Sequence, residues 1–217
     1  MSFTYEYPRP MGTADAALVS PERERPEILL IRRGQAPYAG CFALPGGFMD
    51  LDETPQRTAE RELQEETNLS GIALRPLFTC AQPGRDPRGR SLTMVYGALV
   101  QASSLTPRGG DDAAEARWFC LDELPEMAFD HARVVAQIAA HLRWQASTSV
   151  IGRDLLPADF SAEALLALHE RVLGRRCTES PLDRGIRLGL IQRAANGCWR
   201  FVPPADSGYP DWEPLVW

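Results

Sequence analysis

A cluster of acidic side chains in the first third of the sequence has the residue types and spacing for metal chemistry. Residues 61–66 read Arg-Glu-Leu-Gln-Glu-Glu. On a helix, Glu62, Glu65 and Glu66 stand at positions i, i+3 and i+4 and therefore share one face. Like charges this close repel each other, whereas a hard divalent cation is held by carboxylate oxygens and keeps positions open for water and phosphate. The cluster therefore predicts a metal site for phosphate chemistry, and a solvated acidic helix face is the alternative.

The spacing around this cluster resembles the Nudix box, Gly-x5-Glu-x7-Arg-Glu-U-x-Glu-Glu-x-Gly-U, in which U is an apolar residue. Gly47 and Glu53 occupy the first two fixed positions, and residues 61–66 occupy the central ones. Asn68 stands where the family has its second Gly. This position follows a helix end, where a left-handed residue is required, and Asn is the most tolerant residue there after Gly.

The resemblance implies hydrolysis of a diphosphate by a metal-activated water molecule. Glu62, Glu65 and Glu66 would hold Mg²⁺ or Mn²⁺, with the Gly46 carbonyl as a further ligand. The metal would neutralise phosphate charge and activate the water. Arg61 lies on another face of the helix, and we expect it to orient a carboxylate through a bidentate pair.

Further acids could complete the reaction. Glu53 lies one residue before the expected helix cap, where it acts either in the site or as an acid that stabilises the helix dipole. The general base is left open between Glu62 or Glu66 of the box and Asp112 or Glu115 of a later loop that begins with two glycines. For the loop acids, a solvated loop is the alternative interpretation.

A polar loop at residues 81–90 offers two guanidinium groups for substrate binding. Arg85 and Arg88 are held near Pro and Gly residues and could clamp a diphosphate or a terminal sugar. An ordinary exposed hairpin loop is the alternative. The loop resembles one in ADP-ribose pyrophosphatase-like Nudix proteins, and so does the stretch Phe129-Asp130-His131. For His131, packing at the start of a helix is favoured over catalysis.

The hydrophobic pattern predicts the elements that position these residues. Thr54 and Pro55 predict the start of the carboxylate helix, which ends near Asn68. Asp130 is expected to cap a second helix at residues 132–144. Strands are expected at residues 16–19, 27–33, 41–44, 75–80, 91–101 and 115–121. This order predicts an α/β (α+β) fold, the α/β/α sandwich with a mixed sheet that the Nudix resemblance implies.

The pattern changes beyond a predicted linker at residues 147–149. Helices are expected at residues 161–174 and from Ser180-Pro181 onward, and Asn196-Gly197 between two short runs indicates a hairpin. Helix, turn, helix and hairpin is the layout of a small winged helix-turn-helix domain. The expected domains are a Nudix hydrolase domain at residues 1–146 and a winged-helix-like domain at residues 147–217.

The composition narrows the compartment and the partners. The chain has 217 residues, 44% of them hydrophobic, and a formal net charge of −6, which argues against a protein coated by nucleic acid. It contains neither a run of about 18 apolar residues nor a basic, apolar leader, so we expect no membrane contact. The five cysteines include no Cys-x-x-Cys pair, which predicts a reduced, cytoplasmic protein.

The whole chain resembles a subgroup that holds ADP-ribose pyrophosphatase-like enzymes and Nudix-related transcriptional regulators of NAD metabolism. The resemblance implies either an enzyme that cleaves ADP-ribose or a related nucleoside diphosphate derivative to AMP and a sugar phosphate, or a regulator that senses ADP-ribose and binds DNA. The intact box favours the enzyme. Seven Arg within residues 171–200 permit the regulator, although the second C-terminal helix lacks the Arg-rich run of such regulators. A homodimer is expected in either case.

Overall fold

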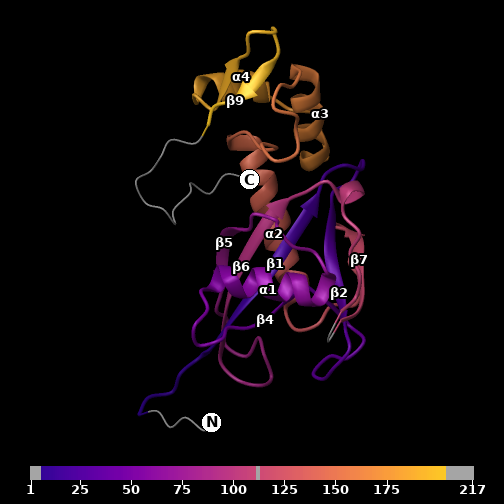
Figure 1. Ribbon diagram of the computed structural model, residues 1–217, viewed down its shortest axis with the longest axis vertical. Helices are drawn as coiled ribbons and strands as arrows, with labels where there is room; N and C mark the ends of the chain where they lie inside the picture. Colours follow the sequence, from indigo (N-terminus) through magenta and orange to yellow (C-terminus); the bar gives the residue numbers. More distant parts are fainter. Residues whose placement is uncertain (1–5, 111–112, 204–217) are drawn as a thin grey trace.

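The computed structural model describes residues 6–110 and 113–203 and has a mixed β-sheet at its centre (Figure 1). The strands of this sheet are β1 (Met11–Ser20), β2 (Glu27–Arg33), β3 (Phe42–Ala43), β4 (Gly46–Phe48), β5 (Arg75–Cys80), β6 (Ser91–Leu99) and β7 (Ala113–Cys120). Their order is β3-β2-β1-β6-β5, with β4 also paired to β1 and β7 to β2. The pair β1–β6 is parallel and the other pairs are antiparallel, so the predicted mixed sheet is confirmed.

Two helices cover the two faces of the sheet, α1 (Pro55–Thr67) and α2 (His131–Thr148). Helix α1 starts as predicted, because the side chain of Thr54 accepts a hydrogen bond from the backbone N–H of Arg57 at 3.3 Å. It ends as predicted at Asn68, which adopts a left-handed conformation with φ of 58°. The carboxylate helix is therefore bounded by its own local chemistry at both ends.

The central strand β1 supplies apolar side chains to both layers of the core. Ala16 and Leu18 pack with Leu63 of α1. Ala17 and Val19 belong to the cluster beneath α2. Successive side chains of a strand point to opposite faces, so β1 links the two layers and is buried along most of its length.

Strand β4 was not predicted from the sequence. Its three residues, Gly46–Phe48, pair antiparallel with residues 13–15 of β1. A three-residue strand with two glycines has no hydrophobic alternation, so the sequence predicted only the end of a strand and a glycine-rich turn at this position. The pairing places Gly46, the residue before the box, directly beside Asp15.

Helix α2 is longer than predicted and removes the expected linker. Ser147 and Thr148 lie in its last turn, where both hydroxyls donate to the Trp144 carbonyl at 2.8 Å. These local hydrogen bonds make the Ser/Thr-rich stretch compatible with helix. The helix therefore passes through the expected boundary between residues 146 and 147. Neither α2 nor any other helix among the described residues is long and apolar enough to cross a membrane.

The predicted order of helix, helix and hairpin follows α2. The elements are α3 (Ala162–Leu173), α4 (Pro181–Arg187) and the hairpin strands β8 (Ile191–Arg193) and β9 (Trp199–Phe201). Ser161 caps α3 by accepting from the Ala164 N–H at 3.2 Å, and Gly174 ends it with φ of 65°. A short 3-10 turn, η1 (Ala102–Ser104), follows β6 earlier in the chain.

Buried polar contacts fasten α3 and α4 to the end of α2. Arg184, only 4% exposed, donates to the carbonyls of Ala146 at 2.8 Å and Ser149 at 3.0 Å. His169 is fully buried; its Nδ1 lies 2.9 Å from the Ala146 carbonyl, and its Nε2 accepts from the Ile151 N–H at 3.2 Å. We call these five residues the α2 joint. The joint holds the C-terminal elements against the same core that the sheet uses.

Candidate active site

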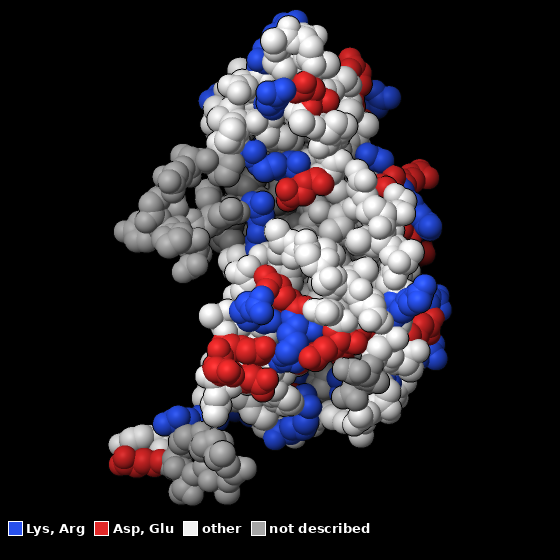
Figure 2. All heavy atoms as spheres, in the orientation of Figure 1, with Lys and Arg blue, Asp and Glu red and all other residues white. Residues whose placement is uncertain are grey.

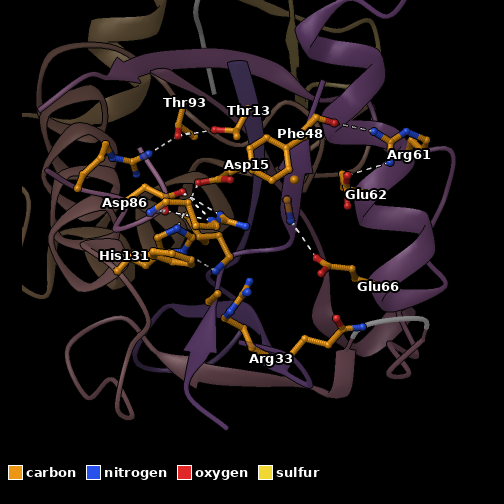
Figure 3. A pocket seen from close by; sticks show the side chains of 18 of the residues that line it. Thr13, Asp15, Arg33, Phe48, Arg61, Glu62, Glu66, Asp86, Thr93 and His131 are labelled. Carbon is orange, nitrogen blue, oxygen red and sulfur yellow. Dashed lines mark hydrogen bonds and ion pairs between the residues drawn. The ribbon is translucent and has the colours of Figure 1, made fainter. Parts of the chain in front are cut away.

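A cavity of about 350 Å³ opens between β1, β4, α1 and the start of α2. Figure 3 shows its two sides. The α1 side carries Arg61, Glu62 and Glu66. The opposite side, which we call the β1 side, carries Thr13, Asp15, Asp86, Thr93 and His131.

The two glycines of β4 permit close contact with the carboxylates of α1. The Gly46 N–H donates to Glu66 Oε2 at 2.9 Å. A Cβ atom placed on Gly47 would lie 2.2 Å from Glu62 Oε1, which is far inside contact distance. Gly47 therefore leaves the space that the Glu62 carboxylate occupies, and Gly46 supplies a backbone donor to Glu66.

Arg61 ties the acidic residues of the box together. Its guanidinium makes the expected bidentate pair, and the partner is Glu53, with Nε to Oε1 at 2.8 Å and Nη2 to Oε2 at 3.0 Å. Nη1 also donates to Glu62 at 2.8 Å and to Glu65 at 3.0 Å. Nη2 also donates to the Phe48 carbonyl at 3.0 Å, so Arg61 connects α1 to β4. One guanidinium thus fixes the orientation of three carboxylates.

The environments of Glu53 and Glu66 shift their pKa values in opposite directions. Hydrogen bonds from Arg61, helped by Thr58, lower the pKa of Glu53 to about 2. Burial raises the pKa of Glu66 to about 8, although the Gly46 N–H opposes the shift. Burial also raises the pKa of Glu62. Glu53 is therefore a permanent anion, whereas Glu62 and Glu66 are held in surroundings that favour a proton or a cation.

The donor set on the α1 side fits a hard divalent cation at Glu62 and Glu66. Both carboxylates line the cavity, and a cation there would offset the cost of burying their charge. Glu65 is placed differently, since its side chain is 42% exposed and turned toward Arg61. Across residues 6–110 and 113–203, no three His, Cys, Asp or Glu side chains form a ready-made metal cluster.

Arg85 and Arg88, the predicted substrate clamps, occupy different environments. Arg85 is 6% exposed and makes a bidentate pair with Asp130, with Nη2 to Oδ1 at 2.8 Å and Nε to Oδ2 at 3.2 Å. Arg88 pairs with Asp86 at 2.8 Å, and its guanidinium lies 4.8 Å from the centre of the Phe48 ring. Of these two arginines, Arg88 is the one whose guanidinium remains partly exposed at the cavity.

The pair with Arg85 changes the role expected of Asp130. This residue stands at the N-cap position of α2 as predicted, but its side chain makes no capping hydrogen bond. Its carboxylate is engaged by the guanidinium of Arg85, 45 residues earlier in the chain. The expected cap is therefore replaced by a long-range ion pair that anchors the 81–90 loop.

Asp15 lines the cavity but was not predicted as a site residue from the sequence. It is 5% exposed, burial raises its pKa to about 7, and its Oδ2 has no hydrogen-bond partner. His131 lies beside it, with Nε2 3.6 Å from Asp15 Oδ2, and starts α2 as expected while also lining the cavity. Burial lowers the pKa of His131 to about 4. A single Asp within an otherwise small and apolar strand was the available signal for this position.

Glu115, the described acid of the later loop, does not line the cavity. Glu115 pairs opposite Arg32 in the β2–β7 ladder, so its carboxylate lies 3.4 Å from Arg32 and 3.2 Å from Arg117, outside the cavity lining. The sheet register is the physical reason for this placement. The other loop candidate, Asp112, lies outside the described residues.

The arginines of the C-terminal elements do not form one exposed row. Arg184 is buried in the α2 joint, and Arg187 pairs with Glu179 at 2.6 Å. Arg175 and Arg176 are exposed. On the face shown in Figure 2, acidic and basic side chains are interspersed over the C-terminal elements.

Some known proteins match only the part of the chain that contains the β-sheet, and others match nearly the whole chain. A family model described as "NUDIX domain" matches residues 11–138. An ADP-ribose pyrophosphatase of Methanocaldococcus jannaschii is 41% identical over 119 residues, which cover 55% of this chain and 68% of that protein. The ADPR responsive transcriptional repressor NtrR of Acinetobacter baylyi is 30% identical over 192 residues, 86% of this chain and 76% of that protein.

A solved structure extends the likeness beyond the region of the family model. Shewanella oneidensis NrtR complexed with a 27mer DNA superimposes with a TM-score of 0.67 at 28% identity. The superposition covers 88% of this chain and 93% of that one. The likeness therefore includes the elements that follow α2.

Proposed function

The chain belongs to the NUDIX family, and we propose that it is a hydrolase that cleaves the diphosphate of ADP-ribose, or of a related nucleoside diphosphate derivative, into AMP and a sugar phosphate. The observation that carries this proposal is the seating of Glu62 and Glu66 in one cavity, which on its facing side contains the Asp15 Oδ2 atom without a hydrogen-bond partner. The 41% identity to an ADP-ribose pyrophosphatase supports the substrate class.

Glu62 and Glu66 would hold Mg²⁺ or Mn²⁺, the divalent metals that suit oxygen ligands. The Gly46 carbonyl is a proposed further ligand. Glu65 would join the set by releasing the Nη1 of Arg61, which it now contacts at 3.0 Å. When bound, the cation would supply charge neutralisation at the phosphates and make the attacking water a stronger nucleophile.

The protein's own side chains would position and deprotonate that water. Glu53 keeps its negative charge and fixes Arg61, which in turn orients Glu62. We place the general base at Glu62 or Glu66, because both carboxylates line the cavity in which the water would be activated. Glu115 is left out of this mechanism because its carboxylate lies in the β2–β7 ladder.

Substrate contacts are proposed at the mouth and on the β1 side. Arg88 would meet a phosphate oxygen, since its guanidinium is partly exposed beside Phe48. Arg85 would act indirectly, because its two bonds to Asp130 hold the loop against the start of α2.

A second function is favoured by the length of one match. The chain is 30% identical to an ADPR responsive transcriptional repressor over 86% of its own length, which supports a regulator that binds DNA. Arg175 and Arg176 would then supply exposed phosphate contacts. Burial of Arg184 in the α2 joint removes one of the arginines that such a surface would use.

We propose a homodimer and a cytoplasmic location for either function. The five cysteines are all free thiols. A reducing compartment keeps thiols in this state.

The deciding experiment incubates the full chain with ADP-ribose and Mg²⁺ and follows products by chromatography. The expected result is equal release of AMP and ribose 5-phosphate, abolished by excess EDTA and restored by added Mg²⁺. Thermal stabilisation by ADP-ribose without turnover would reject the hydrolase. In that case, specific binding of a promoter fragment at physiological salt, reversed by ADP-ribose, would support the regulator.

A further inference from the structure

The β1 side of the cavity contains two polar atoms that face each other without bonding. Asp15 Oδ2 and His131 Nε2 are 3.6 Å apart, which is too long for a hydrogen bond. Both residues are buried, at 5% and 7% exposed, and both line the cavity. Asp15 Oδ2 has no other hydrogen-bond partner among the described residues. Buried polar atoms are nearly always paired, so this gap requires an explanation.

The hydrogen bond on the far side of the His131 ring determines which atom it offers to the cavity. The Leu44 N–H donates to Nδ1 at 3.0 Å, so Nδ1 is an acceptor. A neutral imidazole carries one proton, which must then be on Nε2. The gap is therefore bounded by a donor, the Nε2–H of His131, and, when the carboxyl group is ionised, by an acceptor, the Oδ2 of Asp15.

We propose that the Asp15–His131 pair is a binding site for one hydroxyl group of a sugar in the substrate. A hydroxyl both donates and accepts, and an oxygen placed about 2.8 Å from each atom would satisfy both at once. A phosphate oxygen would be repelled by the carboxyl group, and an ammonium group would face the N–H of the ring. The inference rests on the proposed function, because it assigns the sugar part of a nucleoside diphosphate derivative to this side.

The position of the pair agrees with this assignment. Figure 3 shows Asp15 and His131 across the cavity from Glu62 and Glu66. A diphosphate held against α1 would therefore extend its sugar toward the β1 side. Both side chains of the pair belong to rigid elements, one to the central strand and one to the first turn of α2.

The packing around the pair keeps its geometry fixed before a ligand arrives. The Gly46 backbone packs so closely beside the Asp15 carboxyl group that a Cβ atom there would lie 2.4 Å from Oδ1. The His131 ring is fixed by the Leu44 N–H. Sites of this kind reject ligands that lack the matching hydroxyl, because the protein groups are then left unpaired.

The test compares ligands that differ by one hydroxyl, in binding experiments that need no turnover. Calorimetric titration of the full chain would use AMP with 2′-deoxy-AMP and 3′-deoxy-AMP, and ribose 5-phosphate with 2-deoxyribose 5-phosphate. For the wild-type protein, we expect loss of the recognised hydroxyl to weaken binding about tenfold. Equal affinities within every set would overturn the proposal.

Two variants connect that discrimination to the pair. His131→Asn keeps an acceptor for the Leu44 N–H but removes the donor toward Asp15, and Asp15→Ala removes the acceptor. Each should bind the hydroxyl and deoxy ligands equally, whereas Asp122→Asn, a surface control outside the cavity, should keep the wild-type ratio. Thermal unfolding would verify that each protein is folded. A tenfold ratio that persists in both pair variants would show that the hydroxyl is recognised elsewhere in the protein and would overturn the proposal.

The outcome is separable from that of the proposed function. Release of AMP without hydroxyl discrimination would reject this inference and leave the hydrolase intact. Hydroxyl discrimination that depends on Asp15 and His131, without release of AMP, would support the binding site and reject the hydrolase.

Discussion

A buried histidine lies at each end of helix α2, His131 as its first residue and His169 against its last turn, and the two rings form different hydrogen bonds. At the joint, His169 bonds through both ring nitrogens, to the Ala146 carbonyl and the Ile151 N–H. At the cavity, His131 bonds through one nitrogen and turns the other toward Asp15 across 3.6 Å. Burial lowers the pKa of both rings to about 4. Burial and pKa alone therefore do not separate structure from function.

The difference lies in whether the polar atoms are satisfied. The α2 joint contains polar groups that complete each other's hydrogen bonds, as a buried structural network must. The cavity retains the open Oδ2 of Asp15 and carboxylates at Glu62 and Glu66 whose pKa values are raised. Substitutions in the cavity should therefore impair chemistry, and substitutions in the joint should impair stability.

The largest expected effect is that of Glu66→Gln on catalysis. Gln keeps an oxygen for the Gly46 N–H but lacks the charge that a cation requires, so release of AMP should fall roughly a hundredfold or more. The free energy of unfolding of the metal-free protein should not fall at neutral pH, because the buried carboxyl already has a pKa of about 8. Glu60→Gln, on the same helix and outside the cavity lining, is the matched control and should keep the wild-type rate. Full activity in Glu66→Gln would contradict a metal site at Glu66.

Arg184→Ala should show the reverse behaviour. It removes bonds to the Ala146 and Ser149 carbonyls from a buried position and should lower the free energy of unfolding by about 3 kcal/mol. Urea unfolding would measure the loss, while the folded protein should keep its rate of AMP release. The exposed control Arg176→Ala should change stability by less than about 0.5 kcal/mol. Equal stability of the two variants would contradict the structural role of the joint.

The pH dependence of the free energy of unfolding tests whether His169 is buried in its neutral form. The folded pKa of His169 is about 4, below the usual 6.5, so its stabilising contribution is complete above pH 6.5 and is lost as pH falls toward 4. The loss amounts to about 3 kcal/mol at most. His169→Gln cannot take up this proton. The wild type should therefore lose more stability than the variant between pH 7 and pH 4.

The comparison with the variant isolates His169 from groups with other pH trends. Asp15 and Glu66, whose pKa values are raised in the folded state, gain stability as pH falls and partly hide the effect in the wild type alone. These groups remain in both proteins, so their contributions cancel in the difference. A difference that does not change with pH would contradict a neutral, buried His169.

The smallest expected effects concern the left-handed residues that end α1 and α3. Asn68→Gly should change the free energy of unfolding by less than about 1 kcal/mol and leave AMP release unchanged, since φ of 58° suits both residues. Gly174→Ala, at φ of 65°, should lower stability by about 1 kcal/mol. Chemical unfolding would measure both. A large loss of activity in Asn68→Gly would mean that the Asn side chain has a role at the box.

Local chemistry explains which features could be predicted from the sequence. The ends of α1 were correct because Thr54, Pro55 and Asn68 act on their own helix. The order of helix, helix and hairpin at the C-terminal end was correct for the same reason. The carboxylates of the box were expected on one helical face, and Glu62 and Glu66 do line one cavity.

Contacts between distant segments explain what the sequence could not predict. Arg85 was expected to be a substrate clamp, and its bidentate pair with Asp130 was not predicted. Strand β4 exists only through its pairing with β1. Asp15 can be recognised as a candidate site residue only when the fold places His131, 116 residues later in the chain, opposite it. Each of these features depends on sheet register, which no short motif specifies.

Helix α2 connects the cavity to the joint as one mechanical part. Its 18 residues form a rod about 27 Å long, with His131 in its first turn and Ala146 in its last. If such a rod pivots at its first turn, each degree of tilt carries the far end about 0.5 Å sideways. A hydrogen bond tolerates a change of only a few tenths of an ångström in its length. The orientation of the His131 ring and the contacts of α3 and α4 with the last turn of α2 therefore both depend on the tilt of this helix.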